Sequence, residues 1–188
     1  QETKRILQEA SVIGRAFLYE ILKRITDLKD TVDKSLSGLE RLDFIRARTL
    51  QPDLEYIFKH ALTQEVVYNG LLKKERQALH ERIGLVIEQL FHDRLPEFYE
   101  TLAYHYKQGQ SLLKAVDYHT KAGEKSFKRY ALDESHAYYK EAYDLLSNKI
   151  HKTKEDEKLL IDLIIKWVYP FSFRGDYMGL IDLLKRHE

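Results

Sequence analysis

Histidines are the side chains of this sequence that could most readily carry metal or proton chemistry, and their spacing argues against both. The eight histidines are scattered, and no two lie four residues apart, as a helical zinc site requires. His80 precedes Glu81, but no second histidine follows at the spacing of a zinc peptidase. The absence of cysteine excludes thiolate metal sites, disulfides and cysteine nucleophiles. We therefore predict no metal site and interpret His80 as a solvated or capping histidine.

Phosphate-binding and catalytic motifs do not occur either. Neither G-x-x-x-x-G-K nor G-x-G-x-x-G is found, so the chain has no recognisable loop for ATP or a dinucleotide. The acidic residues fall mostly on polar helix faces, where a solvated role outweighs acid–base catalysis. No nucleophile is paired with a base. These features predict that the chain is not an enzyme by itself and holds no cofactor of its own.

Composition sets the class of protein and its partners. Hydrophobic residues make up 44% and charged residues 32%, the balance of a globular protein. Thirty-one basic residues against thirty acidic ones give a formal charge of +1, and so no electrostatic basis for binding nucleic acid or an anionic membrane. No apolar run approaches the about 20 residues of a membrane span, and no signal peptide is visible. We expect a cytoplasmic protein without a membrane partner, and we interpret residues 1–188 as part of a longer protein.

The segment from Tyr56 to Leu72 changes its hydrophobic period. Tyr56 and Phe58 lie on one face of a predicted strand, whereas from Leu62 onward apolar residues recur at three- and four-residue intervals, as in a helix. The change falls at His60. The sequence therefore predicts a strand that runs directly into a helix, with His60 at the joint.

Three short helices and a hairpin are predicted before this joint. Helical spacing indicates helices over residues 3–13, from Phe17 to Ile25, and from about residue 31 to Leu42, the last capped by Asp30 or Thr31. The buried face of this third helix is predicted to carry Val32, Leu36, Leu39 and Leu42. The turn signal Gln51-Pro52-Asp53 then separates two extended runs. Three helices followed by a hairpin is the order of a winged-helix domain, which we assign to residues 1–72.

A winged helix invites a DNA-binding interpretation, because its third helix can lie in the major groove. Here that region carries more acidic than basic side chains, namely Asp30, Asp33, Glu40 and Asp43 against Lys34 and Arg41. Carboxylates would repel the phosphates of DNA. Nucleic acid is therefore an unfavoured partner, and a role in packing and signal relay is preferred.

The remainder of the chain is predicted to be helical. Residues 73–95 have the pattern of an amphipathic connecting helix. Over residues 96–188, small and aromatic residues recur as in tetratricopeptide repeats, whose helix pairs bury their apolar faces by stacking. The charged stretch 149–156 is the expected loop. The predicted fold is thus mainly α, a winged-helix domain with a small β-hairpin followed by a tetratricopeptide-like helical array.

Ten of the thirteen tyrosines lie after residue 97, within this array. Tyr106, Tyr118 and Tyr139 occupy repeat-defining positions, where packing between helices is expected. Tyr138 and Tyr143 are the freer candidates for contact with a protein or peptide partner.

Three stretches of the sequence resemble a known family. They are LQEASVIGRAF from residue 7, FKHALTQEVVY from residue 58 and LHERI from residue 79. They look like the region after the P-loop ATPase core of STAND-class signalling ATPases, most of all those associated with class III adenylate/guanylate cyclases. LuxR-type regulators and certain multidomain kinases contain similar stretches. The resemblance is specific through residue 83 and generic across the repeats, and it implies an upstream ATPase domain of the same chain that binds ATP or ADP.

The resemblance also implies a role for the joint. In STAND proteins a histidine of the winged helix can reach the phosphates of the bound nucleotide, and a helix N-terminus beside it favours the anion. His60, supported by Lys59 and Gln64, is the corresponding candidate for a nucleotide-sensing contact. The alternative, a buried histidine that hydrogen-bonds the winged-helix backbone, stays open at this point.

Three functional classes follow from the sequence. The first is a non-catalytic regulatory and coupling module of an ATP-dependent signal-transduction protein, in which the winged helix relays nucleotide state to repeats that bind a partner. The second is a protein-interaction scaffold of tetratricopeptide type. The third, less favoured, is part of a DNA-binding transcription regulator.

Overall fold

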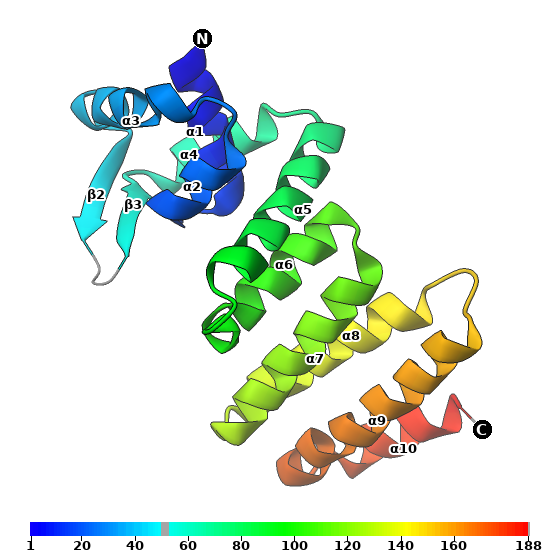
Figure 1. Cartoon of the computed structure of the whole chain (residues 1–188). Helices are drawn as coiled ribbons and strands as arrows, with labels where there is room; N and C mark the ends of the chain where they lie inside the picture. Colours follow the sequence, from blue (N-terminus) through cyan, green and yellow to red (C-terminus); the bar gives the residue numbers. More distant parts are fainter. Residues whose placement is uncertain (50–52, 188) are drawn as a thin grey trace. The chain divides into compact units, whose positions relative to one another are not determined.

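The computed structural model describes residues 1–49 and 53–187, and it is mainly helical, as the sequence predicts (Figure 1). These residues form ten α-helices and one three-stranded antiparallel sheet. The chain divides into two compact units. The first comprises Gln1–Leu95 with Gln108–Gln110, and the second comprises Pro96–Lys107 with the residues from Ser111 onward.

The elements before residue 95 combine helices with the sheet. In chain order they are α1 (Glu2–Ile13), β1 (Ala16–Leu18), α2 (Tyr19–Ile25), η1 (Lys29–Thr31), α3 (Val32–Arg41), β2 (Ile45–Thr49), β3 (Leu54–Phe58), α4 (Ala61–Asn69) and α5 (Lys73–Leu90). The later elements are all helical. They are η2 (Leu95–Phe98), α6 (Tyr99–Gly109), α7 (Leu112–Lys128), α8 (Leu132–Ser147), α9 (Lys154–Arg174) and α10 (Tyr177–Lys185).

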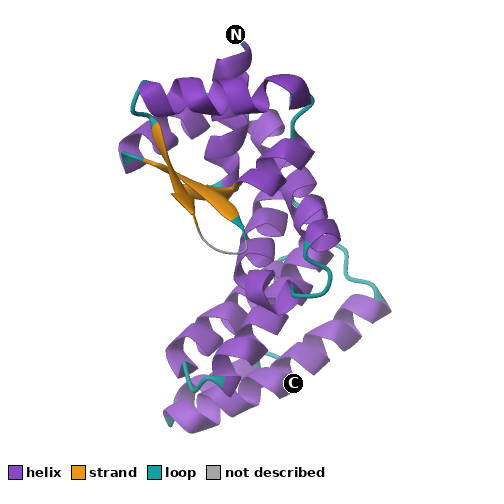
Figure 2. Cartoon of the chain, turned by 60° about the vertical axis from the view of Figure 1, so that its left-hand side comes forward, coloured by secondary structure: helices purple, strands orange, loops and turns teal. Residues whose placement is uncertain are grey.

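The first unit contains the sheet, drawn in orange in Figure 2. Its strand order is β1-β3-β2. The central strand β3 pairs antiparallel with both neighbours, so that Phe17 lies opposite Tyr56 and Ile45 opposite Phe58. Phe17 and Phe58 are buried, with ring centroids 5.8 Å apart. The prediction of a helix from Phe17 is wrong at its start, because Phe17 belongs to β1. Pairing with a strand some forty residues away overrides the local helical pattern.

Two details of the predicted third helix also differ. The Thr31 hydroxyl donates to the Leu28 carbonyl at 3.2 Å and makes no capping bond to α3. Leu42, predicted on the buried face, is exposed because α3 ends before it. The hairpin strands β2 and β3 pair as predicted, while Gln51 and Pro52 of the predicted turn lie outside the described residues.

Helices α4 and α5 follow the sheet and differ in burial. α4 has no fully buried residue, whereas α5 buries one face that includes Leu79, Ile83 and Ile87. His80 lies on that face with only 1% of its surface exposed. The prediction of a solvated histidine is therefore wrong. Its neighbours in the preceding turn, Arg76 and Gln77, are polar, and the sequence gives no sign that Tyr68 covers it.

The second unit is a series of helices that pack on their neighbours in the sequence. α7 packs against α8, α8 against α9, and α9 against α10. A Cβ at Gly123 would lie 3.0 Å from the Tyr139 ring, and the Ser135 hydroxyl donates to the Gly123 carbonyl at 2.9 Å. These two small residues let α7 and α8 approach closely. Tyr106, Tyr118 and Tyr139 are buried, as predicted from their positions.

The predicted loop over 149–156 ends earlier than expected. α9 begins at Lys154 because Thr153 and Asp156 form a capping box. The Asp156 backbone N–H donates to the Thr153 hydroxyl at 3.2 Å, and the Thr153 backbone N–H donates to the Asp156 carboxylate at 2.8 Å. Lys149 donates to the same carboxylate at 2.5 Å. The hydrogen bond from Lys149 contributes most, and together with the bonds to Thr153 it lowers the pKa of Asp156.

Candidate functional site

The first candidate site is the joint between β3 and α4, where His60 is the residue that precedes the helix. Its backbone is extended, and its carbonyl accepts from the N–H of Thr63 at 3.1 Å and of Gln64 at 3.4 Å. Its side chain is exposed and makes no capping bond to α4. The alternative of a buried histidine bonded to the backbone is therefore wrong. The imidazole is accessible to a group outside the described residues.

The two residues predicted to support His60, Lys59 and Gln64, make contacts within the first unit. The Lys59 ammonium forms an ion pair with Asp43, a residue in the left-handed region at φ 61°. The Gln64 side-chain amide donates to the Ser11 carbonyl at 2.6 Å, near the end of α1. Both contacts fix where the strand ends and the helix begins. The structure thus brings the three residues to one joint, but only His60 has a side chain without such a contact among the described residues.

Beside this imidazole, α4 presents an apolar surface. Leu62 and Val66 lie one helical turn apart, with 67% and 63% of their surfaces exposed. Leu72 at the end of the following turn is exposed as well. The sequence pattern predicts an amphipathic helix here, and the apolar side of that helix faces solvent over much of its length.

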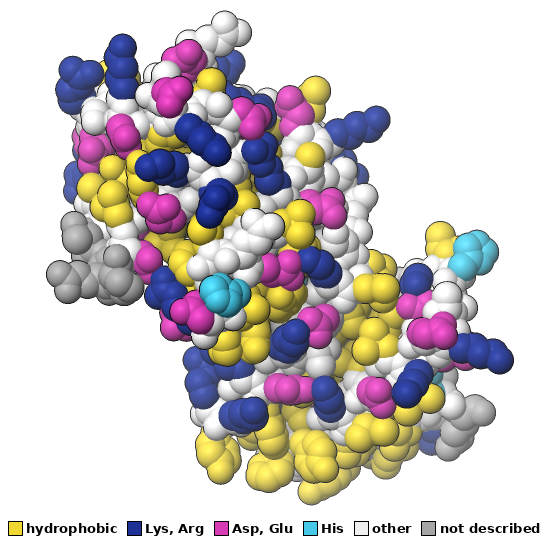
Figure 3. Space-filling model, viewed as in Figure 1, with side chains coloured by type: hydrophobic (Ala, Val, Ile, Leu, Met, Phe, Trp, Pro, Cys, Tyr) yellow, Lys and Arg dark blue, Asp and Glu magenta, His cyan; other side chains and the backbone are white. Residues whose placement is uncertain are grey.

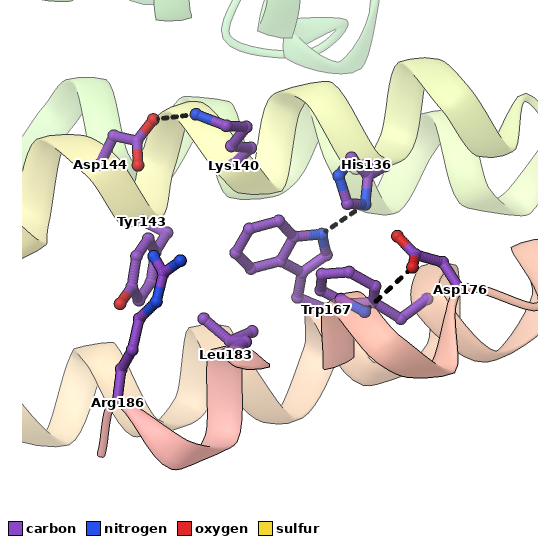
Figure 4. Close-up of a pocket in the computed structure, with 10 residues that line it drawn as sticks. His136, Lys140, Tyr143, Asp144, Trp167, Asp176, Leu183 and Arg186 are labelled. Carbon is purple, nitrogen blue, oxygen red and sulfur yellow. Dashed lines mark hydrogen bonds and ion pairs between the residues drawn. The ribbon is translucent and has the colours of Figure 1, made fainter. Parts of the chain in front are cut away.

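The second candidate site is a pocket of about 250 Å³ in the helical unit, between α8, α9 and α10 (Figure 4). Its floor is aromatic. The Trp167 and Phe171 ring centroids are 4.9 Å apart, and Tyr143 lies 5.6 Å from Trp167. The Trp167 indole N–H donates to His136 Nδ1 at 3.2 Å. Since Nδ1 accepts a hydrogen bond, it carries no proton, in keeping with a His136 pKa that burial lowers.

Charged groups line the rim of this pocket. Lys140 donates to Asp144 at 2.5 Å, and Arg186 lies on the opposite side (Figure 4). Asp176 caps α10 by accepting from the Gly179 N–H at 3.0 Å. The lining therefore offers an apolar, aromatic surface with charges of both signs around it. Such a site can hold one side chain of a partner, since its volume is below the 300–1,000 Å³ typical of drug-sized ligands.

The two tyrosines predicted to contact a partner have different surroundings. Tyr143 is 7% exposed, packs on Trp167 and shares a 2.8 Å hydrogen bond with His187. A partner could therefore contact only the edge of the Tyr143 side chain that lines the pocket. Tyr138 is half-buried and lies outside the pocket, with its ring 6.0 Å from that of His119. The structure does not bring these two tyrosines into one site.

Among the pocket residues that sequence reasoning missed are His136 and Arg186. Trp167 and Phe171 could be found because they lie one helical turn apart on an apolar face. His136 is 31 residues away from Trp167, on another helix, and no local pattern connects the two. Arg186 has an ordinary place near the end of a helix, where basic residues are common.

Further exposed apolar side chains occur on α9. Ile161, Ile165, Tyr169 and Phe173 recur every four residues and are each more than half exposed. Phe127 of α7 packs on the last of these, with ring centroids 5.4 Å apart. Figure 3 shows hydrophobic side chains gathered at the lower end of the second unit. Single exposed apolar residues are ordinary, but a stripe of this kind is the surface that helical repeats present to another helix.

No group of three or more metal-binding side chains occurs in residues 1–49 and 53–187. Within the same residues, no helix combines the length and apolar character needed to cross a membrane.

Part of this chain is similar in sequence to a known protein. An uncharacterized protein of Rhizobium meliloti is 33% identical over 108 residues, which cover 56% of this chain and 10% of that protein. The matched region thus spans about a tenth of the relative's length. No family model matches the sequence, and no solved structure matches it.

Proposed function

We propose that this chain is a non-catalytic coupling module of an ATP-dependent signal-transduction protein of the STAND class, of the kind associated with nucleotide cyclases. In this proposal the first unit is a winged helix that responds to ATP or ADP held by an upstream P-loop ATPase domain of the same protein. The second unit is a tetratricopeptide-like array that binds a protein or peptide partner. The nucleotide state is passed from one unit to the other.

The order of elements supports this assignment. Three helices and an antiparallel sheet in the order β1-β3-β2 fit a winged helix. Consecutive packing of α7, α8 and α9 fits an array in which each helix pair buries its face on the next. A relative in which the matching residues form about a tenth of the protein suits a module within a multidomain chain.

The observation that carries the proposal is the exposed imidazole of His60 at the start of α4. A helix N-terminus favours an anion through its free N–H groups and its dipole. Lys59 and Gln64 hold the joint through Asp43 and Ser11, so His60 is positioned by a fixed backbone. A nucleotide phosphate docked there would receive a hydrogen bond from an imidazole whose backbone is already held in place.

A protein-interaction scaffold is the second candidate, and the pocket beside Trp167 favours it. This pocket and the exposed stripe of α9 provide an aromatic anchor site and an apolar face, which suit a peptide or helix partner. They serve equally as the partner-binding part of the coupling module. The two proposals therefore differ in whether partner binding depends on nucleotide.

DNA binding is disfavoured by the local charge balance. Arg46 and Arg48 of β2 lie 3.9 Å from Asp43 and 3.7 Å from Glu55, respectively. On α3, the Glu40 carboxylate accepts the Ala47 N–H at 2.9 Å and stays at this surface. Basic groups already matched by carboxylates release few counterions on binding DNA.

The test is nucleotide retention by the full-length protein. The protein is purified without added nucleotide, and the bound ATP and ADP are released by denaturation and quantified by chromatography. A lost charge-assisted hydrogen bond weakens binding by about 10- to 150-fold, so His60→Ala is expected to purify largely free of nucleotide. His92→Ala, another exposed histidine of the first unit, is the matched control and is expected to retain it.

Two outcomes would contradict different parts of the proposal. Wild-type protein that neither retains nor binds nucleotide would overturn the coupling function. Equal retention by the wild type, His60→Ala and His92→Ala would leave the ATPase intact and overturn the contact with His60.

A further inference from the structure

A second pocket, of about 190 Å³, lies in the first unit and differs from the aromatic pocket in its chemistry. Its lining consists of Tyr68, Lys73, Arg76, Gln77, His80 and Gln108. Every one of these described side chains is polar, two are cationic, and none is a carboxylate. The chain as a whole has nearly equal numbers of acidic and basic residues. This local excess of positive charge and N–H donors therefore needs an explanation.

The spacing along α5 places four of the lining residues on one face. Lys73, Arg76, Gln77 and His80 are at positions i, i+3, i+4 and i+7. Lys73 is the first residue of the helix, where the dipole disfavours a positive charge. Like charges three residues apart also destabilise a helix. An anion between Lys73 and Arg76 would offset both costs.

Neighbouring contacts hold the donors in place. The Arg76 guanidinium lies 4.8 Å from the centre of the Tyr68 ring and donates to the Asn69 side chain at 3.1 Å. The Tyr68 hydroxyl shares a 3.0 Å hydrogen bond with His80 Nε2. His80 is buried, and Gln108 is half-buried. The pocket therefore has a fixed polar wall and does not consist only of mobile surface lysines.

We propose that this pocket binds a small oxyanion, either free phosphate or the terminal phosphate group of a larger ligand. Arg76 offers several N–H donors in a rigid plane, which matches the oxygens of a phosphate, and Lys73 adds a compact charge. Gln77 and Gln108 supply neutral amide donors. A cavity of about 190 Å³ has room for one phosphate group together with water. The proposal does not depend on His60 or on an ATPase domain.

Isothermal titration of the 188-residue chain with inorganic phosphate at low salt tests the proposal. Saturable binding is expected in the wild type. Arg76→Met is expected to weaken it by about tenfold or more, since a charge-assisted hydrogen bond is lost. Lys74→Met removes the same charge from the adjacent exposed residue, which does not line the pocket, and is expected to change the affinity less than twofold. The ring resonances of His80 should shift on titration in the wild type and in Lys74→Met.

Gln108→Glu provides a variant that leaves the contact between Arg76 and Tyr68 intact. The added carboxylate at a half-buried position should abolish phosphate binding without unfolding the chain, which circular dichroism would verify. Adenosine monophosphate is titrated in parallel, with adenosine as the neutral control. Tighter binding of the monophosphate than of phosphate would identify the phosphate of a larger ligand, and equal binding would identify the free anion.

The proposal is overturned by the absence of saturable phosphate binding in the wild type. It is also overturned if Arg76→Met and Gln108→Glu bind phosphate as the wild type does. Binding that shifts other histidines but not His80 would assign the anion to another surface and refute this pocket.

Discussion

Replacing His119 with leucine is expected to make the second unit less sensitive to acid. His119 lies on α7 with 6% of its surface exposed, and neither ring nitrogen has a hydrogen-bond partner among the described residues. Burial, opposed by Glu141 and reinforced by Lys107, lowers its pKa from 6.5 to about 4. His119 therefore binds a proton more weakly in the folded state than in the unfolded chain.

The sign and size of the effect follow from this pKa difference. Well above pH 6.5, His119 is neutral in both states and contributes almost no pH dependence. As the pH falls from 6.5 toward 4, the unfolded state binds the proton first, so the free energy of unfolding decreases. Between pH 7.5 and pH 5.0 the loss from this one residue is about 2 kcal/mol.

Trp167 makes the assay specific. It is the single tryptophan of the chain and lies in the core of the second unit, so its fluorescence during urea denaturation reports on that unit. His119→Leu keeps the side chain apolar and similar in size, and it should remove about 2 kcal/mol from the difference in unfolding free energy between pH 7.5 and pH 5.0. It should also raise stability at pH 7.5, because two buried polar atoms without hydrogen bonds are lost.

His80→Leu is the matched control. His80 is also buried with a pKa lowered to about 4, by burial and by Arg76, but it lies in the first unit. It should leave the transition detected at Trp167 unchanged. If His119→Leu and the wild type lose equal free energy of unfolding on acidification, the assignment of acid sensitivity to His119 is refuted.

Three further substitutions test local structure through the free energy of unfolding in urea at neutral pH. Thr153→Ala removes the capping box of α9 and should cost about 1 kcal/mol, and Thr153→Ser should restore most of it; equal stability of all three proteins would refute the cap. Gly175→Ala should cost about 1 kcal/mol, because φ is 70° while nothing lies within 4 Å of the new Cβ; an unchanged stability would refute the left-handed conformation. Gln64→Ala should cost about 1 kcal/mol through the lost bond to Ser11, and protection of the α4 amides from hydrogen exchange should decrease; unaltered exchange would show that this bond does not hold the joint.

The sequence predicts most helices, the hairpin strands and the position of His60, because these depend on local periodicity. The sequence does not predict β1, because Ala16–Leu18 form a strand only by pairing with β3. It also overestimates the burial of Leu42 and the exposure of Tyr143, because hydrophobic spacing does not say which face another element will cover.

The two pockets could not be predicted from the sequence either, because each is formed by residues of different helices. His80 and Tyr68 are 12 residues apart on different helices, and His136 and Trp167 are 31 apart. Each pair forms one contact only after the helices pack, so neither pocket has a sequence motif. The position of His60 at the joint is found from sequence, because the change of period itself marks the end of a strand and the start of a helix, whereas its exposure is seen only in the structure.

Hydrogen exchange in the full-length protein tests the central claim most directly. Amide exchange in α6, α7, α8 and α9 is measured by mass spectrometry with ADP and with ATP, in the wild type and in His60→Ala. The coupling account predicts that exchange in these helices differs between the two nucleotides in the wild type and becomes the same in His60→Ala. Identical exchange with ADP and ATP in the wild type would contradict it, because the nucleotide state would then have no effect on these helices.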